Sequence, residues 1–130
     1  MTKPGGEKKK RKKSKKATIT DRADAIFGQI VRAPGYCCNC GSTDTIQCAH
    51  GFSRSYRSVR WDTRNAFPLC RACHFHFTQR PLEWDEWLRN KWGEDLYAEI
   101  RALALAGEKV DMPELIESLR ATWSDTEAAA

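Results

Sequence analysis

Two Cys-x-x-Cys pairs, Cys37/Cys40 and Cys70/Cys73, constrain the fold of this chain more than any other feature of its sequence. Two thiolates three positions apart on a tight turn can bind one metal ion at about 2.3 Å, and two such pairs complete a closed, structural zinc site. Gly41 allows the first turn to close back on itself. The segment that separates the pairs is longer than the roughly 15–20 residues of a simple zinc ribbon, so we expect further structure within it.

The two remaining cysteines, Cys38 and Cys48, are expected to be small buried hydrophobic residues. No apolar segment of a secretion signal follows the charged N-terminus. We therefore expect thiolate–metal chemistry in a reducing cytoplasm rather than disulfides. Two alternatives remain: Cys38 replaces Cys37 as a ligand, although its spacing to Cys40 is tight, or all six cysteines form disulfides.

Positive charge is concentrated in two parts of the chain, although the net charge is only +5. Residues 1–16 hold nine Lys or Arg and one Glu, and residues 50–80 hold six Arg and one Asp, whereas residues 81–130 hold twelve acidic and five basic residues. This distribution indicates a polyanionic ligand, and nucleic acid is the commonest one. We expect residues 1–17 to form a disordered tail that binds DNA without sequence preference. Its contacting residues would be Lys8, Lys9, Lys10, Arg11, Lys12 and Lys13; a tail that only improves solubility is the alternative.

Hydrophobic periodicity predicts a helix over residues 20–32 with Thr20 or Asp21 as its cap. A strand is predicted over residues 45–50, and a second strand or turn, broken by Pro68, over residues 65–69. A helix follows the second cysteine pair and ends before residue 81.

The remainder of the chain has a helical pattern, with helices predicted over residues 82–92 and 94–106 and a last one starting near Pro113. Three tryptophans in it, Trp84, Trp87 and Trp92, are expected in the core. The predicted fold class is a small α+β domain. A zinc-stapled module, residues 18–80, carries a helical extension, residues 81–124, packed on it, and residues 125–130 are frayed. No stretch approaches the roughly 18 apolar residues of a membrane span.

Three further residues lie in and just after the gap between the cysteine pairs: His50 ends the first predicted strand, Asn65 follows, and His74 comes directly after Cys73. Together with the cysteines they resemble the HNH endonuclease superfamily, whose ββα-metal module is a β-hairpin and a helix with a metal between them. The matching strings are Cys37-x-x-Cys40-Gly41, Ala49-His50, Asn65 and Leu69-Cys70-x-x-Cys73-His74, so the resemblance covers about residues 36–79. More narrowly, residues 48–74 are similar to phage recombination proteins of the NinG (Rap) and RecA-dependent nuclease Ref families. That similarity implies action on recombination intermediates or displaced strands.

The resemblance implies a role for each of these residues in hydrolysing a DNA phosphodiester bond. His50 would be the general base, because imidazole titrates near neutrality. Asn65 would orient the segment that positions His50 through its side-chain amide, and His74 would bind a catalytic divalent metal, Mg²⁺ or another. We expect His50 and His74 to face one another across a small gap, and the products to be a 5′-phosphate and a 3′-hydroxyl.

The chain departs from the superfamily at Ala49, where many relatives carry an acidic residue or a histidine as an extra metal ligand. Asp62 and His76 are the nearest replacements. His76 is two positions from His74 and would point away from it on a regular helix. Asp62 is therefore the favoured additional ligand, and a degenerate site that binds DNA without cutting it is the alternative.

Arg54, Arg57 and Arg60 recur at every third position beside His50, with aromatic residues Tyr56 and Trp61 between and after them. Arginine matches phosphate oxygens, and aromatic rings stack on exposed bases, so we expect this segment to contact DNA. A solvated loop with no ligand is the alternative.

These features predict a metal-dependent HNH DNA endonuclease that acts in phage recombination on single-stranded or branched DNA. A second hypothesis is a non-catalytic zinc-knuckle DNA-binding accessory protein. A third is an adaptor whose acidic C-terminal helices bind a partner such as a recombinase.

Overall fold

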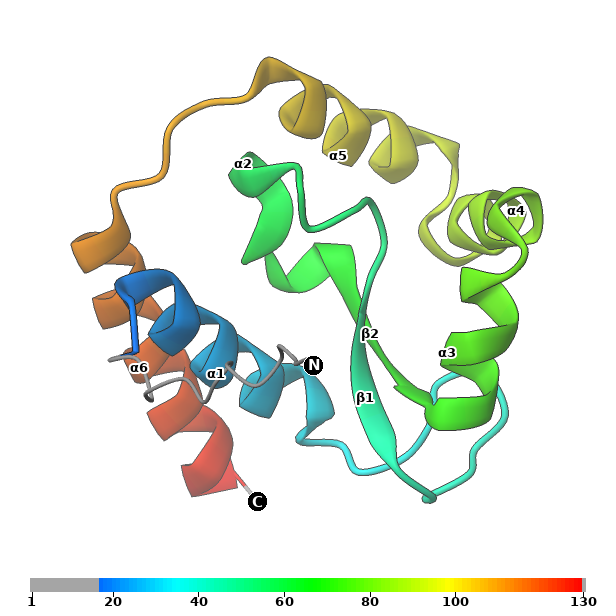
Figure 1. The fold of residues 1–130 in the computed structure, drawn as a ribbon, viewed down its shortest axis with the longest axis horizontal. Helices are drawn as coiled ribbons and strands as arrows, with labels where there is room; N and C mark the ends of the chain where they lie inside the picture. The colour runs from blue at the N-terminus through cyan, green and yellow to red at the C-terminus, as the bar shows by residue number, and fades with distance from the viewer. Residues whose placement is uncertain (1–16, 130) are drawn as a thin grey trace, which may run out of the picture.

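The structure, a computed structural model, describes residues 17–129. Its elements in chain order are α1 (Ile19–Arg32), β1 (Ile46–His50), α2 (Arg57–Arg60), the short 3₁₀ helix η2 (Thr63–Asn65), β2 (Ala66–Cys70), α3 (Arg71–Thr78), α4 (Pro81–Trp92), α5 (Glu94–Ala106) and α6 (Met112–Ala129). The predicted small α+β fold is confirmed, because helices surround one antiparallel pair of strands (Figure 1). The basic residues Lys8 to Lys13 lie outside the described residues.

Helix α1 is capped by Thr18, so the prediction of Thr20 or Asp21 as its cap is wrong. The Asp21 N–H donates to Thr18 Oγ1 at 3.0 Å, and the Thr18 N–H donates to Asp21 Oδ2 at 3.1 Å. This reciprocal pair satisfies two main-chain donors at the start of the helix. The buried stripe of α1, predicted from its periodicity, includes Ala23, Phe27 and Val31.

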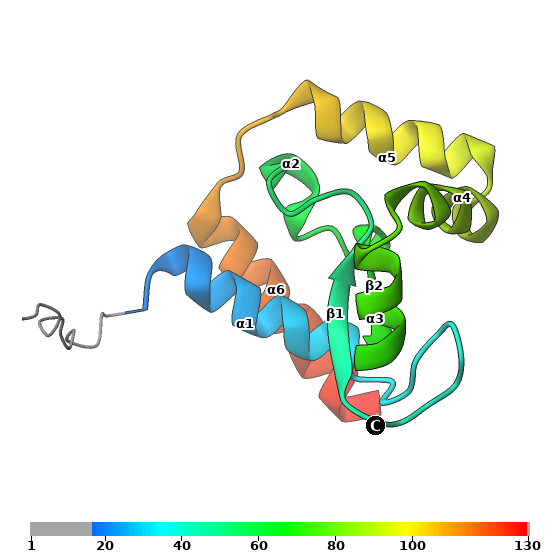
Figure 2. The same cartoon turned by 45° about the vertical axis from the view of Figure 1, so that its right-hand side comes forward.

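Helix α6 lies alongside α1 (Figure 2) and completes the first core with it. Ile116 and Leu119 of α6 are buried in the same cluster as Phe27 of α1. Helix α6 continues to Ala129, past the expected fraying point at residue 125. None of the helices in residues 17–129 has the combination of length and apolar character needed to cross a membrane.

Strands β1 and β2 pair with Ile46 opposite Cys70 and His50 opposite Ala66. Strand β2 continues through Pro68, so the expected break at this proline is wrong. The Pro68 carbonyl accepts a 2.9 Å hydrogen bond from the Cys38 N–H, on the side away from β1. The N–H and C=O of one residue point to the same side of an antiparallel strand. Because the Pro68 carbonyl points away from β1, the absence of an N–H at this proline costs no hydrogen bond to β1. Pro68 instead ties the first cysteine turn to the sheet.

Helix α4 packs its three tryptophans on Phe67 of β2, as predicted for core residues. Each indole N–H also donates to a different connecting segment: Trp84 to the Gly51 carbonyl at 2.8 Å, Trp87 to Asn39 Oδ1 at 3.0 Å, and Trp92 to the Arg64 carbonyl at 3.1 Å. These three bonds join α4 to the segment after β1, to the first cysteine turn and to η2, just before β2. The helical extension therefore holds the loops of the central module in place.

Helix α5 covers α2 (Figure 1). Val59 of α2 is fully buried against Ile100 and Ala104 of α5. The Ser58 hydroxyl donates to the Leu103 carbonyl at 2.8 Å, which fixes α2 on the C-terminal half of α5.

Candidate functional site

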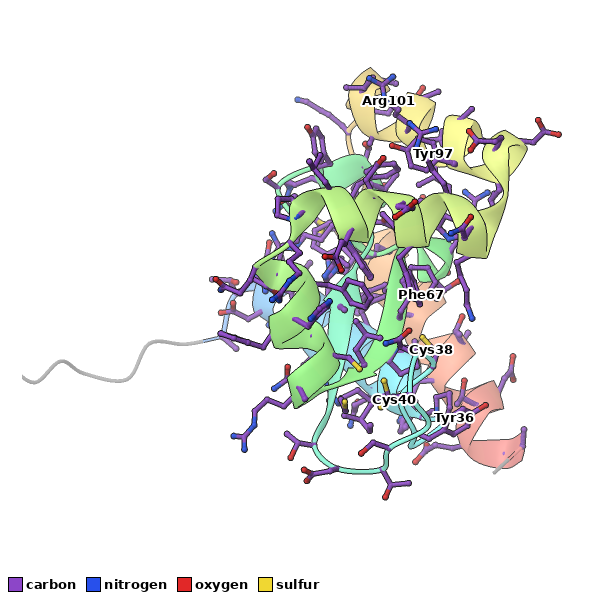
Figure 3. All side chains as sticks on the ribbon, turned by 90° about the vertical axis from the view of Figure 1, so that its right-hand side faces the viewer. Tyr36, Cys38, Cys40, Phe67, Tyr97 and Arg101 are labelled. Carbon is purple, nitrogen blue, oxygen red and sulfur yellow. The ribbon has the colours of Figure 1, made fainter. Side chains whose placement is uncertain are left out.

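Four cysteines converge where the first cysteine turn meets the end of β2 and the start of α3. The Sγ atoms of Cys37, Cys40, Cys70 and Cys73 all lie within 4.8 Å of one another, and Figure 3 shows Cys40 on the connection between α1 and β1. The Cys40 and Cys70 Sγ atoms are 3.7 Å apart. Four thiolates around one zinc ion at about 2.3 Å would have sulfur–sulfur separations of about 3.8 Å. The cluster therefore has the dimensions needed to hold a tetrahedral metal ion.

Main-chain N–H groups point at the sulfur atoms of this cluster. Cys37 Sγ accepts from the N–H groups of Asn39 and Cys40, and Cys70 Sγ accepts from the Cys73 N–H, each at 3.4 Å. Burial disfavours the Cys37 thiolate, but main-chain donors outweigh this effect and lower its pKa to about 6. These donors stabilise the thiolate of Cys37, and a thiolate is the protonation state that a metal ion requires.

Asn39 supports the cluster from outside the ligand set. Its amide nitrogen donates to Cys73 Sγ at 3.3 Å, and its amide oxygen accepts from the Trp87 indole. Helix α4 therefore positions a group that touches a sulfur atom of the cluster, a contact that the spacing of the residues in the sequence does not predict.

The other two cysteines, Cys38 and Cys48, pack against the cores as apolar residues but are only partly buried, so the prediction that they are buried is met in part, and all six cysteines are free thiols. Cys38 packs on the core that includes Phe67 and Leu69 of β2, and Cys48 packs on the core formed by α1 and α6. Burial raises the pKa of the Cys48 thiol to about 11, so it remains protonated at neutral pH.

His50 is the last residue of β1, and its ring nitrogen Nε2 is hydrogen-bonded. Its Nε2–H donates to the Arg60 carbonyl at 2.8 Å, which leaves Nδ1 as the unprotonated nitrogen of the neutral ring. The ring stacks on Phe27 of α1, with centroids 5.6 Å apart. Burial lowers the pKa of His50, and the positive charges of Arg54 and Arg60 act in the same direction. The imidazole is therefore neutral and able to accept a proton near neutral pH.

A groove of about 360 Å³ lies between α1 and β1 and includes His50. Arg32 of α1 and Arg54 line it, together with Asp24 and Gln47. Arginines beside a proton acceptor suit a phosphate group, because the guanidinium is a planar donor for its oxygens. Arg32 was not predicted from the sequence, because its place at the groove depends on how α1 packs on the strands.

Asn65 is fully buried and holds together the segment that follows His50. Its Oδ1 accepts from the Phe52 N–H at 2.7 Å, and its Nδ2 donates to the carbonyls of Phe52 and Val59, each at 3.1 Å. A Cβ added to Gly51 would come within 2.8 Å of Asn65 Oδ1, so only glycine fits directly after His50. The amide contacts are of the kind expected for Asn65, and they fix the segment between β1 and α2.

His74, in the first half of α3, binds Gln47 of β1 rather than facing His50. Its Nδ1 donates to Gln47 Oε1 at 2.7 Å, and burial lowers its pKa. Alternate side chains of a strand point to opposite faces. His50 therefore points to α1, whereas Gln47 and Ala49 lie on the face that α3 covers. The expectation that the two imidazoles face each other is not met, although Gln47 lines the groove of His50 and contacts His74.

Asp62 does not lie with His74 in a metal-binding group. Its carboxylate accepts three hydrogen bonds from Arg64, at 2.7–3.0 Å, and these bonds outweigh burial and lower its pKa. His76 is paired with Glu83 at 3.0 Å. Within residues 17–129, the four cysteines form the only group of three or more histidine, cysteine or acidic side chains placed to share a metal ion.

The three predicted DNA-binding arginines have different environments. Arg54 is exposed, and Arg57 lies over the Trp61 ring with no carboxylate partner in residues 17–129. Arg60 is only 13 % exposed and binds both oxygens of Asp24, at 3.1 and 2.6 Å. Trp61 is buried and donates to the same carboxylate at 2.9 Å. Arg60 and Trp61 are both bound to Asp24, so the predicted DNA contact falls first to Arg54 and Arg57.

Comparisons with known proteins do not assign this site. The chain matches no protein-family model, and no curated protein or solved structure is significantly similar to it.

Proposed function

We propose that this chain is a metal-dependent DNA endonuclease of the HNH type. The observation that carries the proposal is the imidazole of His50. Its Nε2 is held by the Arg60 carbonyl, and its ring lies in a groove with two arginines. A general base must be neutral and fixed in orientation, and both conditions are met here.

The reaction is hydrolysis of a phosphodiester bond. His50 Nδ1 takes a proton from the attacking water, while Arg32 and Arg54 bind the non-bridging oxygens of the phosphate. A divalent metal ion, Mg²⁺ or another, would neutralise charge on the leaving oxygen. His74 would hold that ion through Nε2, since its Nδ1 is bound to Gln47. Gln47 Oε1, which is bound to His74, would offer a further oxygen ligand, since the position of the superfamily's additional ligand is occupied by the buried Ala49.

We further propose that the ion of the four-cysteine cluster is zinc and that its role is structural. Four thiolates favour zinc, and a closed set of four protein ligands leaves no position for a substrate. The ion would join the first cysteine turn to the start of α3 and thereby place His74 against β1.

The substrate that we propose is single-stranded or branched DNA of a phage recombination process in a bacterial cytoplasm. A recombinase is a proposed partner. The acidic residues beyond position 81 would not bind DNA and are available to a basic protein surface.

One observation favours a second function, that of a non-catalytic DNA-binding accessory protein. Ala49 is 2 % exposed and lies where a metal ligand would be needed, and residues 17–129 contain no second group of metal-binding side chains. A groove with arginines and no bound metal would still bind DNA.

Cleavage of labelled single-stranded, duplex and branched DNA by His50→Ala and wild type tests the proposal. Mg²⁺, Mn²⁺ and EDTA would be compared. His76→Ala is the matched control, because it removes a histidine that is exposed and lies outside the groove. We expect metal-dependent cleavage that falls by about 10²–10⁴-fold in His50→Ala and is unchanged in His76→Ala. Equal cleavage by His50→Ala would refute the assignment of His50, and no cleavage by wild type with DNA binding retained would favour the accessory protein.

A further inference from the structure

A second pocket lies on the other side of the segment that carries Arg54. Its volume is about 540 Å³, within the roughly 300–1,000 Å³ of typical small-ligand sites. Residues 55–58 form one wall, and residues 107–110, which connect α5 to α6, form the other. Figure 2 shows this connection passing beside α2. The pocket is thus made jointly by the central module and the helical extension.

Hydrogen bonds hold the wall of residues 55–58, and the other wall is anchored by Val110, which packs on the core of α1 and α6. The Tyr56 N–H donates to the Ser53 carbonyl at 2.9 Å, and Ser58 is bound to the Leu103 carbonyl. Ala104, at the base of the pocket, is buried against Val59. The pocket is therefore preorganised, and binding would require little ordering of the walls.

The chemistry of the lining suits a nucleotide. Tyr56 is 42 % exposed and lines the pocket, so its ring is available for a base to stack on. Arg57 and Lys109 supply two positive charges on opposite walls, and neither pairs with a carboxylate in residues 17–129. Glu108 is the one acidic residue of the lining, so the pocket carries a net positive charge.

The pocket and the groove of His50 are lined by consecutive residues of one turn. Arg54 lines that groove, and the very next residue, Ser55, lines this pocket. A strand of DNA that left the groove across this turn would pass beside Tyr56. A paired base cannot expose its face to a side chain, whereas an unpaired base can.

We propose that this pocket binds an unpaired nucleotide of a DNA strand, with the base on Tyr56 and the phosphate between Arg57 and Lys109. The inference rests on the proposed function, because it takes DNA to be the ligand. Such a pocket would give the protein a preference for DNA that contains single-stranded segments. It also assigns a DNA contact to Lys109, although the segment beyond residue 81 is acidic as a whole.

The test measures binding of a fluorescent oligothymidylate and of a duplex to the full chain, by anisotropy in EDTA so that no cleavage occurs. The variants are Tyr56→Ala, Tyr56→Phe, Lys109→Gln and Glu108→Gln. Tyr36→Ala is the matched control, because Tyr36 is an exposed tyrosine on a different surface. Thymidine monophosphate is a competitor that distinguishes a site for free nucleotides from one for a DNA strand.

We expect Tyr56→Ala to weaken oligothymidylate binding by about tenfold, the effect of losing one stacked base, while duplex binding changes by less than about twofold. Tyr56→Phe and Tyr36→Ala should bind like wild type. Lys109→Gln should weaken binding and Glu108→Gln should strengthen it, and monophosphate should compete only weakly. Unchanged binding by Tyr56→Ala, an equal loss for duplex and single strand, or no binding of oligothymidylate by wild type would each overturn the proposal.

The outcome is separable from that of the nuclease proposal. If His50→Ala abolishes cleavage while Tyr56→Ala binds normally, the nuclease stands and the pocket is refuted. If wild type cuts nothing but binds single strands through Tyr56, the pocket stands and the nuclease is refuted.

Discussion

The Nε2–H of His50 donates a 2.8 Å hydrogen bond to the main-chain carbonyl of Arg60, so a group ten residues along the chain selects the tautomer of the proposed base. Because a carbonyl can only accept, Nδ1 is the nitrogen that can receive a proton. The fold thus fixes both the identity and the direction of the basic nitrogen before any substrate binds.

The first prediction concerns the pH dependence of cleavage. Burial and two nearby arginines lower the pKa of His50 below 6.5, and the general base must be neutral. Cleavage should therefore be constant above about pH 6.5 and be lost as the pH falls through the lowered pKa. Arg54→Ala removes one of the positive charges, so the pKa should rise and the acid limb should move to higher pH.

This profile would be measured as single-turnover rates at saturating DNA, so that weaker binding by Arg54→Ala does not affect it. Arg101→Ala, on α5, is the control and should leave the limb in place. An acid limb that does not move in Arg54→Ala would contradict the proposed role of His50.

The second prediction concerns Asn65, whose buried amide makes three hydrogen bonds to main-chain groups. Asn65→Ala leaves these groups without partners, at about 1–3 kcal/mol for each unsatisfied group. The free energy of unfolding should therefore fall by at least about 3 kcal/mol in urea titrations. Asn90→Ala, at an exposed position of α4, should change it by no more than about 0.5 kcal/mol. A loss below about 1 kcal/mol in Asn65→Ala would mean that water replaces the amide.

Features set by local spacing could be predicted from the sequence. Each cysteine pair needs only a tight turn, so its spacing predicts a metal-binding group. The tryptophans of α4 recur on one helical face, so their spacing predicts that they pack on the core. The position of His50 at a strand end follows equally from a local pattern. The cap of α1 was missed because Thr18, Thr20 and Asp21 are all suitable, and only the reciprocal bonding of Thr18 with Asp21 decides between them.

Features set by distant partners could not be predicted in this way. Arg60 matched the three-residue spacing of Arg54 and Arg57, but its partner, Asp24, lies on α1 and is reached only after α1 packs on the strands. Likewise, the spacing of His50 and His74 gives no information on which face of β1 each one meets. The pairing of His74 with Gln47 required the register of the sheet and the position of α3.

The third prediction concerns the four-cysteine cluster. Metal analysis of the purified chain should find one zinc ion per chain, and Cys70→Ser should lose the ion and unfold, because structural zinc contributes folding free energy. Cys38→Ser, whose thiol lies outside the cluster, should keep the ion and the fold. Circular dichroism and metal content measured on the same samples provide the test. A folded, metal-free Cys70→Ser would show that the cluster is not a structural site.

The fourth prediction concerns Arg54 and Arg60, whose equal spacing in the sequence suggests the same role but whose contributions to stability should differ. Arg60 is mostly buried and binds both oxygens of Asp24, whereas Arg54 has a side chain that is 63 % exposed and lies 3.8 Å from that carboxylate. Arg60→Ala should therefore lower the free energy of unfolding by about 2 kcal/mol, the contribution of hydrogen bonds to a charged group. Arg54→Ala should lower it by less than about 0.5 kcal/mol, because exposed ion pairs contribute little.

The effects of the two substitutions on DNA binding should be reversed. If Arg54 contacts a phosphate, Arg54→Ala should weaken binding and reduce the log–log dependence of affinity on salt concentration by about 0.9. Arg60→Ala, measured at a temperature where it remains folded, should keep the wild-type salt dependence, because its guanidinium is already neutralised by Asp24. The opposite pattern, a lower salt dependence in Arg60→Ala alone, would mean that DNA displaces Asp24 and that the ion pair opens when the groove is filled.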